Sequence, residues 1–429
     1  MAVSRPARIR LTVHVPSDKS ISHRCLILNA LADGAARIDG ILESEDVRST
    51  ARCLGDLGVG IDWPAGSASA TVRGRGLHGL AEPEDVLDCG NSGTSIRLLA
   101  GVLAAQPFLS ILSGDSSLRG RPMARVIGPL REMGAGIQAR RGDTLPPLVI
   151  RGGPLRGIAY DTPVASAQVK SALLLAGRLA AGPTSVREPA QSRDHTERML
   201  GAMGAQISLD GGRIVVIPAE RLEPLDVRVP GDISSAAPWL VLGACHPDAE
   251  ITVCGVNTNP TRTGLVDIMT AMGADLEVQE QRMVGGEPVA DIVVRTSRLR
   301  GVEVSGALVP RAIDELPLVA VLGCFAEGRT AVRDAAELRA KESDRVESVV
   351  SVLGRMGAAV EPAPDGFAVV PGALHGAWVD AGGDHRIGML AAIAGAVADG
   401  ETWVDNDAVS VSYPGFWADL ATAGAGTPV

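Results

Sequence analysis

Aromatic residues are scarce in this chain, and their scarcity restricts how a core can be built. Of the 429 residues only 3% are Phe, Trp or Tyr, whereas 46% are hydrophobic. The core must therefore consist mainly of Ala, Val, Leu and Ile packed on helices and sheets, which indicates a soluble α/β or α+β protein. The length exceeds what one ordinary core accommodates, so we expect two domains.

Net positive charge, closely spaced cysteines and long apolar runs are also absent. The formal charge is −10, which argues against a broad nucleic-acid surface or a polybasic membrane contact. The six cysteines contain no Cys-x-x-Cys pair, so we expect buried free thiols rather than disulfides or a zinc site. The seven histidines show no metal-ligand spacing, so we expect no metal. The start of the chain lacks a signal-peptide apolar region, and we expect a cytoplasmic protein.

A phrase of polar turn, small apolar helix and Gly recurs six times along the chain. Its polar turns fall at Asp18, Ser92, Ser166, Asp232, Asp314 and Asp384. A second phrase, represented by "LGDLGVGID" and "LREMGAGIQ", follows most copies and predicts the end of a second helix, a Gly C-cap and entry into a strand. Each copy is therefore predicted to be a small unit of strand, helix, strand, helix and further strands.

Six such units divide most simply into two similar domains of three units each. Pro224 and Pro230 flank a short segment after the third unit, so we place one crossover between domains near Val229 and a second near Pro16. The first domain would comprise residues 1–16 plus 229–429, and the second would comprise residues 17–228. Two linkers would let the halves close over a ligand, so we expect the active site in the cleft between them.

Cations recur at the predicted helix starts, where the helix dipole disfavours positive charge. They are Lys19, His23 and Arg24; Arg119 and Arg121 before a Pro-started helix; Arg193; Lys341 and Arg345, with Glu342, in one first turn; and His385 and Arg386. Lys341 and Arg345 are four residues apart and are expected on one helix face. Any one of them can be explained as a solvated charge paired with a nearby acid. Their recurrence in an acidic chain instead favours bound phosphate or carboxylate.

Small and polar neighbours strengthen the hypothesis of an anion site, although each has a plainer explanation. The "GNSGTS" stretch, with Gly93 and Thr94, offers backbone amides to a ligand, or is an ordinary turn. "SAQVK", residues 166–170, offers a hydroxyl, an amide and a cation, or is a plain N-cap. Asp314 in "AIDEL" is a functional carboxylate or a helix cap. "GRGLHG" matches a dinucleotide-binding pattern, but no predicted helix follows it.

Eight motifs, in order and across nearly the whole chain, resemble the 5-enolpyruvylshikimate-3-phosphate synthase family. They are "DKSISHR", "GNSGTSIRLL", "LRGRPM", "SAQVKSALLLAG", "RDHTERML", "IDELP", "AKESDR" and "GDHR". The resemblance implies two domains of three βαβαββ units each, an inverted α/β barrel. It also implies transfer of the enolpyruvyl group of phosphoenolpyruvate to the 5-hydroxyl of shikimate 3-phosphate, with release of phosphate. Both substrates are polyanions, which would account for the cations.

The resemblance also assigns roles to individual residues. Phosphoenolpyruvate would be bound by Lys19, Gly93, Thr94, Arg121, Gln168, Arg345 and Arg386. Shikimate 3-phosphate would be bound by Lys19, Ser20, Arg24, Ser166, Gln168, Arg193, Asp314 and Lys341. Glu342 is the candidate proton donor, and Asp314 or Lys19 is the candidate base. Neighbouring cations favour the ionised form of Glu342, so we expect it to become protonated only with both substrates bound. We expect no cofactor, no nucleic-acid or membrane partner, and a monomer.

Three other functions fit parts of the sequence. The sister enolpyruvyl transferase that acts on UDP-N-acetylglucosamine shares the six-unit fold, but it is expected to carry a Cys in the loop that here reads "GDSSLRGRPM". An RNA terminal-phosphate cyclase would need a nucleotide loop and aromatic residues for stacking. A non-catalytic scaffold would give no reason to keep Lys341, Glu342, Arg345 and Arg386.

Overall fold

The computed structural model describes residues 1–405 and 408–427 and divides the chain into two compact units. Unit 1 comprises Met1–Pro16, Pro230–Arg282 and Pro288–Val429, and unit 2 comprises Ser17–Val229 and Met283–Glu287. The five residues 283–287 form the turn region of a hairpin whose strands otherwise belong to unit 1. The sequence analysis did not predict this, because the packing of a hairpin tip depends on segments distant in the chain and not on its local pattern.

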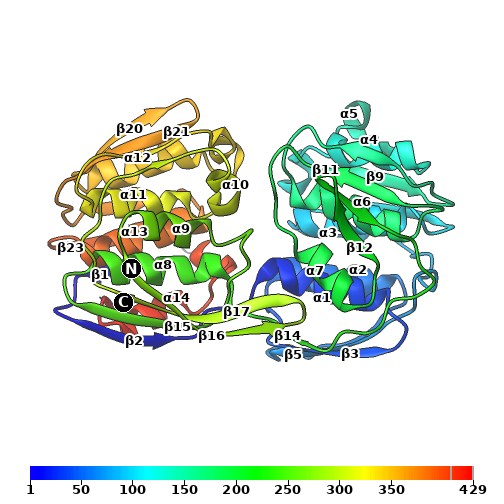
Figure 1. Ribbon diagram of the computed structural model, residues 1–429, viewed down its shortest axis with the longest axis horizontal. Helices are drawn as coiled ribbons and strands as arrows, with labels where there is room; N and C mark the ends of the chain where they lie inside the picture. The colour runs from blue at the N-terminus through cyan, green and yellow to red at the C-terminus, as the bar shows by residue number, and fades with distance from the viewer. Residues whose placement is uncertain (406–407, 428–429) are drawn as a thin grey trace. The chain divides into compact units, whose positions relative to one another are not determined.

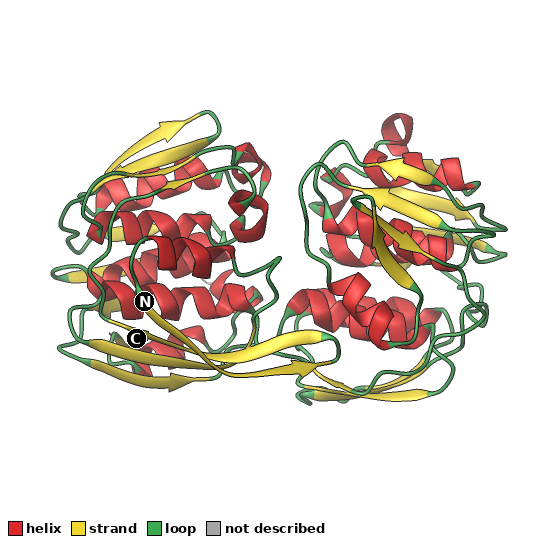
Figure 2. Ribbon diagram, in the orientation of Figure 1, coloured by secondary structure: helices red, strands yellow, loops and turns green. Residues whose placement is uncertain are grey.

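Unit 1 contains three four-stranded sheets among its described residues. In spatial order they are β22 (Trp378–Asp380), β23 (Glu401–Asp405), β1 (Ala2–Ser4) and β24 (Gly426–Thr427); β16 (Asp275–Val284), β17 (Glu287–Arg295), β15 (Ala249–Asn257) and β2 (Ile9–Val13); and β18 (Glu303–Val304), β19 (Thr330–Val332), β21 (Gly366–Val370) and β20 (Ala359–Ala363). Each sheet has one parallel pair at one of its edges, namely β22 with β23, β15 with β2, and β18 with β19. Figure 2 shows these sheets as layers separate from the helices.

Unit 2 repeats this arrangement with three more four-stranded sheets. They are β10 (Ala159–Asp161), β11 (Thr184–Arg187), β13 (Arg213–Val216) and β12 (Ile207–Asp210); β14 (Val227–Arg228), β3 (Ala35–Asp39), β5 (Ser69–Arg73) and β4 (Gly60–Asp62); and β6 (Leu87–Asp88), β7 (Leu109–Ser113), β9 (Leu145–Arg151) and β8 (Gly136–Ala139). Each again begins with a parallel pair and continues antiparallel. The six predicted βαβαββ units are thus present, three in each compact unit.

The helices follow the same alternation (Figure 1). Unit 1 contains α8 (Ile233–Cys245), α9 (Gly264–Ala271), α10 (Leu308–Ala312), α11 (Leu316–Phe325), α12 (Arg345–Arg355), α13 (His385–Val397) and α14 (Phe416–Thr422). Unit 2 contains α1 (Lys19–Ala30), α2 (Glu45–Asp56), α3 (Gly93–Leu103), α4 (Ala124–Met133), the short kinked α5 (Arg140–Asp143), α6 (Ala167–Arg178) and α7 (His195–Ala202). No helix in the described part of the chain combines the length and the apolarity needed to span a membrane.

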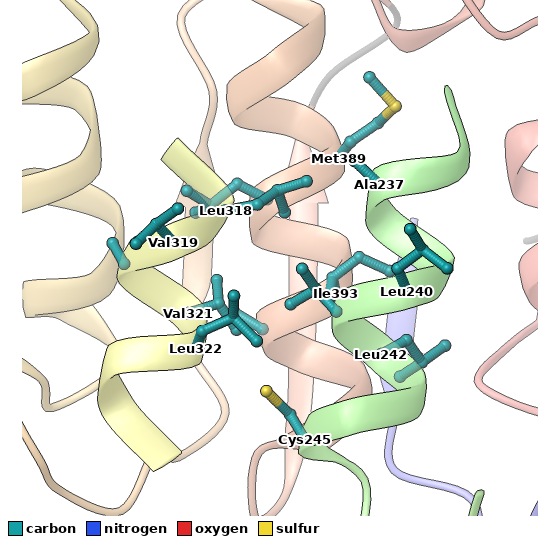
Figure 3. Packing of buried hydrophobic residues seen from close by; sticks show 14 of the residues in the cluster. Ala237, Leu240, Leu242, Cys245, Leu318, Val319, Val321, Leu322, Met389 and Ile393 are labelled. Atoms are coloured by element: carbon teal, nitrogen blue, oxygen red, sulfur yellow. The ribbon is translucent and has the colours of Figure 1, made fainter. Parts of the chain in front are cut away.

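The first helix of each repeat lies in the interior of its unit. In unit 1 every residue of α8 is buried, and α8, α11 and α13 contact one another through Leu240, Leu322 and Ile393 (Figure 3). A helix that is apolar on all sides must be enclosed, which explains the "small apolar helix" phrase of the sequence. As the sequence predicted, aliphatic side chains dominate the core, with Trp239, Tyr413 and Phe416 forming one small aromatic cluster.

Both recurring phrases mark helix ends as the sequence predicted. Side chains of Asp18, Ser92, Ser166, Asp232 and Asp384 cap five of the six interior helices by accepting hydrogen bonds from backbone amides. The second helices end beside glycines with positive φ, namely Gly58, Gly134, Gly204, Gly273 and Gly357. A strand begins within three residues of each of these glycines. The repeat therefore sets the helix boundaries that present the candidate site residues.

Two interior helices of unit 2, α3 and α6, pack closely together, and their N-terminal residues belong to the candidate site. A Cβ on Gly101 of α3 would lie 2.2 Å from the backbone oxygen of Ala172 on α6, so only Gly permits this approach. The N-terminus of α3 carries Gly93 and Thr94, and the first turn of α6 carries Gln168. The approach of the two helices thus brings these two predicted segments together.

Candidate functional site

The N-terminus of α3 gathers four of the predicted phosphoenolpyruvate residues in unit 2. The Gln168 side chain donates from Nε2 to Thr94 Oγ1 at 3.1 Å and accepts at Oε1 from Arg97 Nη1 at 2.6 Å. A Cβ on Gly93 would lie 2.7 Å from an Arg97 nitrogen and 3.1 Å from an Arg121 nitrogen. Free amides of a helix start therefore lie beside two guanidinium groups, an arrangement suited to phosphate or carboxylate.

Arg97 is a cation that the sequence analysis missed. Its donors reach Gln168 Oε1 and the backbone oxygens of Gly93 and Pro122, and it forms no ion pair with any described carboxylate. Burial, together with the positive charges of Arg121 and Arg125, lowers its pKa to about 10. A bound anion would relieve this repulsion. The sequence could have indicated Arg97, because an Arg four residues after Gly93 lies on the same helix face, one turn further on.

Lys19, at the first position of α1, is paired within unit 2. Its Nζ donates to Asp46 Oδ2 of α2 at 3.0 Å, and the two side chains are 36% and 22% exposed. Burial raises the pKa of Asp46, but Lys19, His23 and Arg121 outweigh it and hold this pKa below its usual value. Arg121 and Lys19 thus act on one carboxylate. Asp46 is a second residue that the sequence analysis missed, because α1 and α2 meet only in the fold.

Arg24 is buried, and most of its donors are used inside unit 2. Its Nε donates to Thr196 Oγ1 and its Nη2 to Ser171 Oγ, both at 2.7 Å, while Nη1 donates to the backbone oxygen of Ser20 at 3.0 Å. Arg24 therefore fixes the α1, α6 and α7 segments. Two of its five N–H groups are left for the ligand role that the resemblance assigns to it.

Ser166 and Arg193 lie on neighbouring segments of unit 2. Ser166 caps α6, and its backbone amide donates to Glu188 Oε1 at 3.0 Å. Arg193 is half-buried two residues before α7, in the loop that also contains Ser192. Ser192 donates from its hydroxyl to the same Glu188 at 2.7 Å. One carboxylate thus joins the segments that carry these two predicted shikimate 3-phosphate residues.

His23, one of the basic residues at the predicted helix starts, lies in the core of unit 2. Its Nδ1 is 2.7 Å from Thr50 Oγ1, and its Nε2 is buried without a hydrogen-bond partner among the described residues. Burial lowers its pKa to about 3, which Lys19 and Arg24 reinforce and Asp46 opposes. A group held neutral in this way cannot serve as a proton donor near neutral pH.

The buried His23 predicts acid sensitivity. Since its folded-state pKa is about 3 and its unfolded-state value about 6.5, unfolding takes up a proton between these pH values, and stability falls as pH falls below about 6.5. Urea unfolding of wild type should lose about 2 kcal/mol more than His23→Gln between about pH 7.5 and pH 5. The exposed His375→Gln should behave as wild type. Equal acid sensitivity of wild type and His23→Gln would contradict this assignment.

Unit 1 holds the second group of predicted residues around Arg345. Its side chain is 1% exposed and contacts three carboxylates: Nε with Asp384 Oδ2 at 2.9 Å, Nη2 with Glu342 Oε2 at 2.6 Å and Nη1 with Asp314 Oδ1 at 3.5 Å. Ser343 Oγ also donates to Asp384. The candidate acid and one candidate base are therefore held on a single guanidinium group. An anion that binds Arg345 would compete with these carboxylates.

Arg345 controls the protonation of the carboxylates around it. Burial raises the pKa of Glu342, but Arg345 foremost, then a backbone hydrogen bond and His385, outweigh burial and hold this pKa below its usual value. The same balance holds the pKa of Asp384 down, again with Arg345 as the main opposing charge. Glu342 is thus ionised near neutral pH in the absence of substrates, the direction that the sequence analysis argued from the neighbouring cations.

The helix beside Arg345 begins later than the sequence predicted. Lys341 and Glu342 precede α12, and Asp344 caps it by accepting from the amides of Val346 and Glu347. The prediction that Lys341, Glu342 and Arg345 share a first turn was wrong, because the cap excludes residues before Asp344 from the helix. Lys341 is half-buried and forms no hydrogen bond or ion pair with the described residues.

Asp314 and Arg386 complete the unit 1 group. Asp314 lies between α10 and α11, and the N-cap position of α11 is occupied by Glu315, whose side chain makes no capping bond. Arg386, in the first turn of α13, donates from Nη1 to the backbone oxygen of Ser234 at 3.1 Å. Asp384, which both caps α13 and binds Arg345, was recognised in the sequence only as a turn residue.

Comparison with known proteins places these residues in a family. The profile of the EPSP synthases (3-phosphoshikimate 1-carboxyvinyltransferases) matches residues 3–420. The chain belongs to the EPSP synthase family. It is 52% identical over 424 residues to the 3-phosphoshikimate 1-carboxyvinyltransferase of Herpetosiphon aurantiacus, covering 98% of both chains, and 52% identical over 426 residues to that of Gloeobacter violaceus, again covering 98% of both.

A solved EPSP synthase structure supports the same conclusion at the level of the fold. The structure of EPSP synthase from Acinetobacter baumannii superimposes with a TM-score of 0.90 at 41% identity, covering 98% of both chains. The two-domain α/β fold of the family is therefore confirmed for this chain. Membership of the EPSP synthase family makes it a transferase of the shikimate pathway and does not favour the UDP-N-acetylglucosamine enzyme.

Proposed function

We propose that the chain catalyses enolpyruvyl transfer from phosphoenolpyruvate to the 5-hydroxyl of shikimate 3-phosphate with the residues described above. The observation that supports this most strongly is the Arg345 group, in which Glu342 and Asp314 lie on one buried guanidinium. An acid and a base held on a common cation suit a reaction that adds one proton and removes another. The residues assigned to each substrate come from both units, so we propose that both units act on one pair of substrates.

The proposed reaction has two proton-transfer stages. Glu342 donates a proton to the methylene carbon of phosphoenolpyruvate, C2 becomes cationic, and the 5-hydroxyl oxygen attacks C2 while its proton passes to the base. The resulting tetrahedral intermediate loses phosphate as a proton leaves the new methyl group, which restores the double bond. Lys19, Arg121 and Arg386 would stabilise the phosphate and carboxylate charges during these steps.

The structure suggests how Glu342 acquires the proton it must donate. Its carboxylate now occupies Arg345 Nη2 at 2.6 Å. The carboxylate or phosphate of phosphoenolpyruvate would compete for that guanidinium, because anions of this type form bidentate bonds with Arg. Displacement from Arg345 removes the main charge that lowers the pKa of Glu342, and burial then favours the protonated acid. Substrate binding would thereby prepare the acid.

A direct assay tests the proposed function. Inorganic phosphate released from phosphoenolpyruvate would be measured with and without shikimate 3-phosphate, with no metal or nucleotide added. Release only when both substrates are present is the expected result. Release with UDP-N-acetylglucosamine but not with shikimate 3-phosphate would show that the acceptor is wrong while the transfer chemistry is right.

Gly93→Ala should weaken phosphoenolpyruvate binding. The new Cβ would displace the guanidinium groups of Arg97 and Arg121, which lie 2.7 and 3.1 Å from its position. We expect KM for phosphoenolpyruvate to rise about tenfold, a loss of about 1.4 kcal/mol, with KM for shikimate 3-phosphate nearly unchanged. Gly120→Ala is the matched control, because a Cβ there meets no atom within 4 Å. An unchanged KM in Gly93→Ala would remove this helix start from the phosphoenolpyruvate site.

A further inference from the structure

Lysine is used sparingly in this chain, and its placement is selective. Three of the 40 Lys and Arg residues are lysines: Lys19, Lys170 and Lys341. Lys19 and Lys341 are proposed above to contact the substrates, whereas Lys170 has no role assigned. An ammonium is a compact group with three tetrahedral donors, and it fits where the planar guanidinium does not.

Lys170 lies in the first turn of α6 and is almost wholly enclosed, with a side chain 1% exposed. Its Nζ is 2.9 Å from Glu188 Oε2, 2.8 Å from Glu197 Oε1 and 3.3 Å from the backbone oxygen of Ser192. These three acceptors match the three N–H groups of an ammonium. The side chains of Glu188 and Glu197 are 3% and 13% exposed, so the whole cluster is desolvated.

Glu188 connects Lys170 to the segments that carry the proposed substrate residues. Its Oε1 accepts from the Ser166 amide at 3.0 Å and from the Ser192 hydroxyl at 2.7 Å, while Oε2 binds Lys170. Ser166 is the N-cap residue of α6, and Ser192 directly precedes Arg193. One carboxylate thus sets the distance between the two segments proposed to bind shikimate 3-phosphate.

The charge of Lys170 is what keeps this carboxylate in place. Burial lowers the pKa of Lys170, but Glu197 and Glu188 outweigh it, so the residue stays charged at neutral pH. Without the ammonium, two carboxylates would share one desolvated space, and they would separate or take up a proton. Either response would move Ser166 relative to Arg193.

We propose that Lys170 is a positioning residue for shikimate 3-phosphate, holding Glu188 so that Ser166 and Arg193 are set at the spacing this substrate requires. The inference rests on the proposed function, because it takes Ser166 and Arg193 as ligands of that substrate. It assigns Lys170 no contact with either substrate. Its expected signature is a change in the KM for shikimate 3-phosphate alone.

The test compares two buried cations of the same helix. Lys170→Met should raise KM for shikimate 3-phosphate at least tenfold, with kcat and KM for phosphoenolpyruvate within about threefold of wild type. Arg178→Met is the matched control, since Arg178 is equally buried in α6 but donates to the backbone oxygens of Ile217 and Arg221, away from Ser166. Its KM values should remain those of wild type even where its melting temperature falls. Equal KM changes in the two variants, or none in Lys170→Met, would overturn the proposal.

Two further variants keep the outcome decisive. If Lys170→Met does not fold, Ser192→Ala replaces it as the test, because it removes the hydroxyl that donates to Glu188 with little change in volume. Ser192→Ala should raise KM for shikimate 3-phosphate about threefold. An unchanged KM would overturn the proposal. Ser166→Ala tests the function on which the proposal rests. An unchanged KM in Ser166→Ala would overturn the assigned substrate role itself, whereas a raised KM there with none in Lys170→Met would overturn only the positioning role.

Discussion

Glu342→Gln should reduce turnover about 1,000-fold while leaving both KM values within about threefold of wild type. Gln keeps the shape of the side chain and can still accept a hydrogen bond from Arg345, but it cannot release a proton to the methylene carbon of phosphoenolpyruvate. Substrate binding depends on other groups and should persist. Steady-state kinetics and binding titration with each substrate would measure the two effects separately.

A neighbouring glutamate provides the control for this prediction. Glu347, in the first turn of α12, binds Arg339 at 3.1 Å and contacts none of the proposed catalytic residues. Glu347→Gln should therefore keep normal turnover. Near-normal turnover in Glu342→Gln would remove Glu342 from the mechanism and would leave the Arg345 group with a binding role only.

Much of the fold could be predicted because its determinants are local in sequence. N-caps at Asp18 and Ser92 and positive-φ glycines such as Gly58 are short-range signals, and the repeat displays each of them several times. The prediction failed at the start of α12, where Asp344 competes with the preceding residues to cap the helix. It also missed the tip at 283–287, whose assignment to unit 2 depends on contacts between distant segments.

The candidate site was predictable to the extent that motifs carry its residues. Gly93, Thr94, Arg121 and Gln168 do come together, as do Asp314, Glu342 and Arg345. The partners that tune these residues were not predicted: Asp46 for Lys19, Asp384 for Arg345, and Glu188 for the Ser166 amide. Each of these pairs joins segments at least 20 residues apart, and no spacing rule along the sequence connects them.

The two candidate bases, Lys19 and Asp314, differ in their ability to accept a proton. Lys19 forms an ion pair with Asp46, and an ammonium has no lone pair with which to accept a proton. Asp314 is a carboxylate, which can accept a proton once it is ionised, and it lies 3.5 Å from Arg345 in the same group as the candidate acid Glu342. Asp314 is therefore the better candidate for removing the proton from the 5-hydroxyl.

Asp314→Asn should lower kcat about 1,000-fold, because the amide keeps the shape of the side chain but cannot accept the hydroxyl proton. In wild type the dependence of kcat/KM on pH should include a loss of activity at low pH as the base becomes protonated, and Asp314→Asn should lack that limb. Asp267→Asn is the matched control, since Asp267 is half-exposed and pairs with Arg311 instead of Arg345.

Lys19→Met distinguishes the two bases. If Asp314 is the base, Lys19→Met should mainly raise the KM values, because the ammonium then serves to bind substrate anions, and the acid limb of the pH profile should persist. A collapse of kcat in Lys19→Met, together with an acid limb that survives in Asp314→Asn, would transfer the role to Lys19. That result would require Lys19 to lose its proton when substrates bind. Asp46 would then either stop pairing with Lys19 or take up the proton that Lys19 loses.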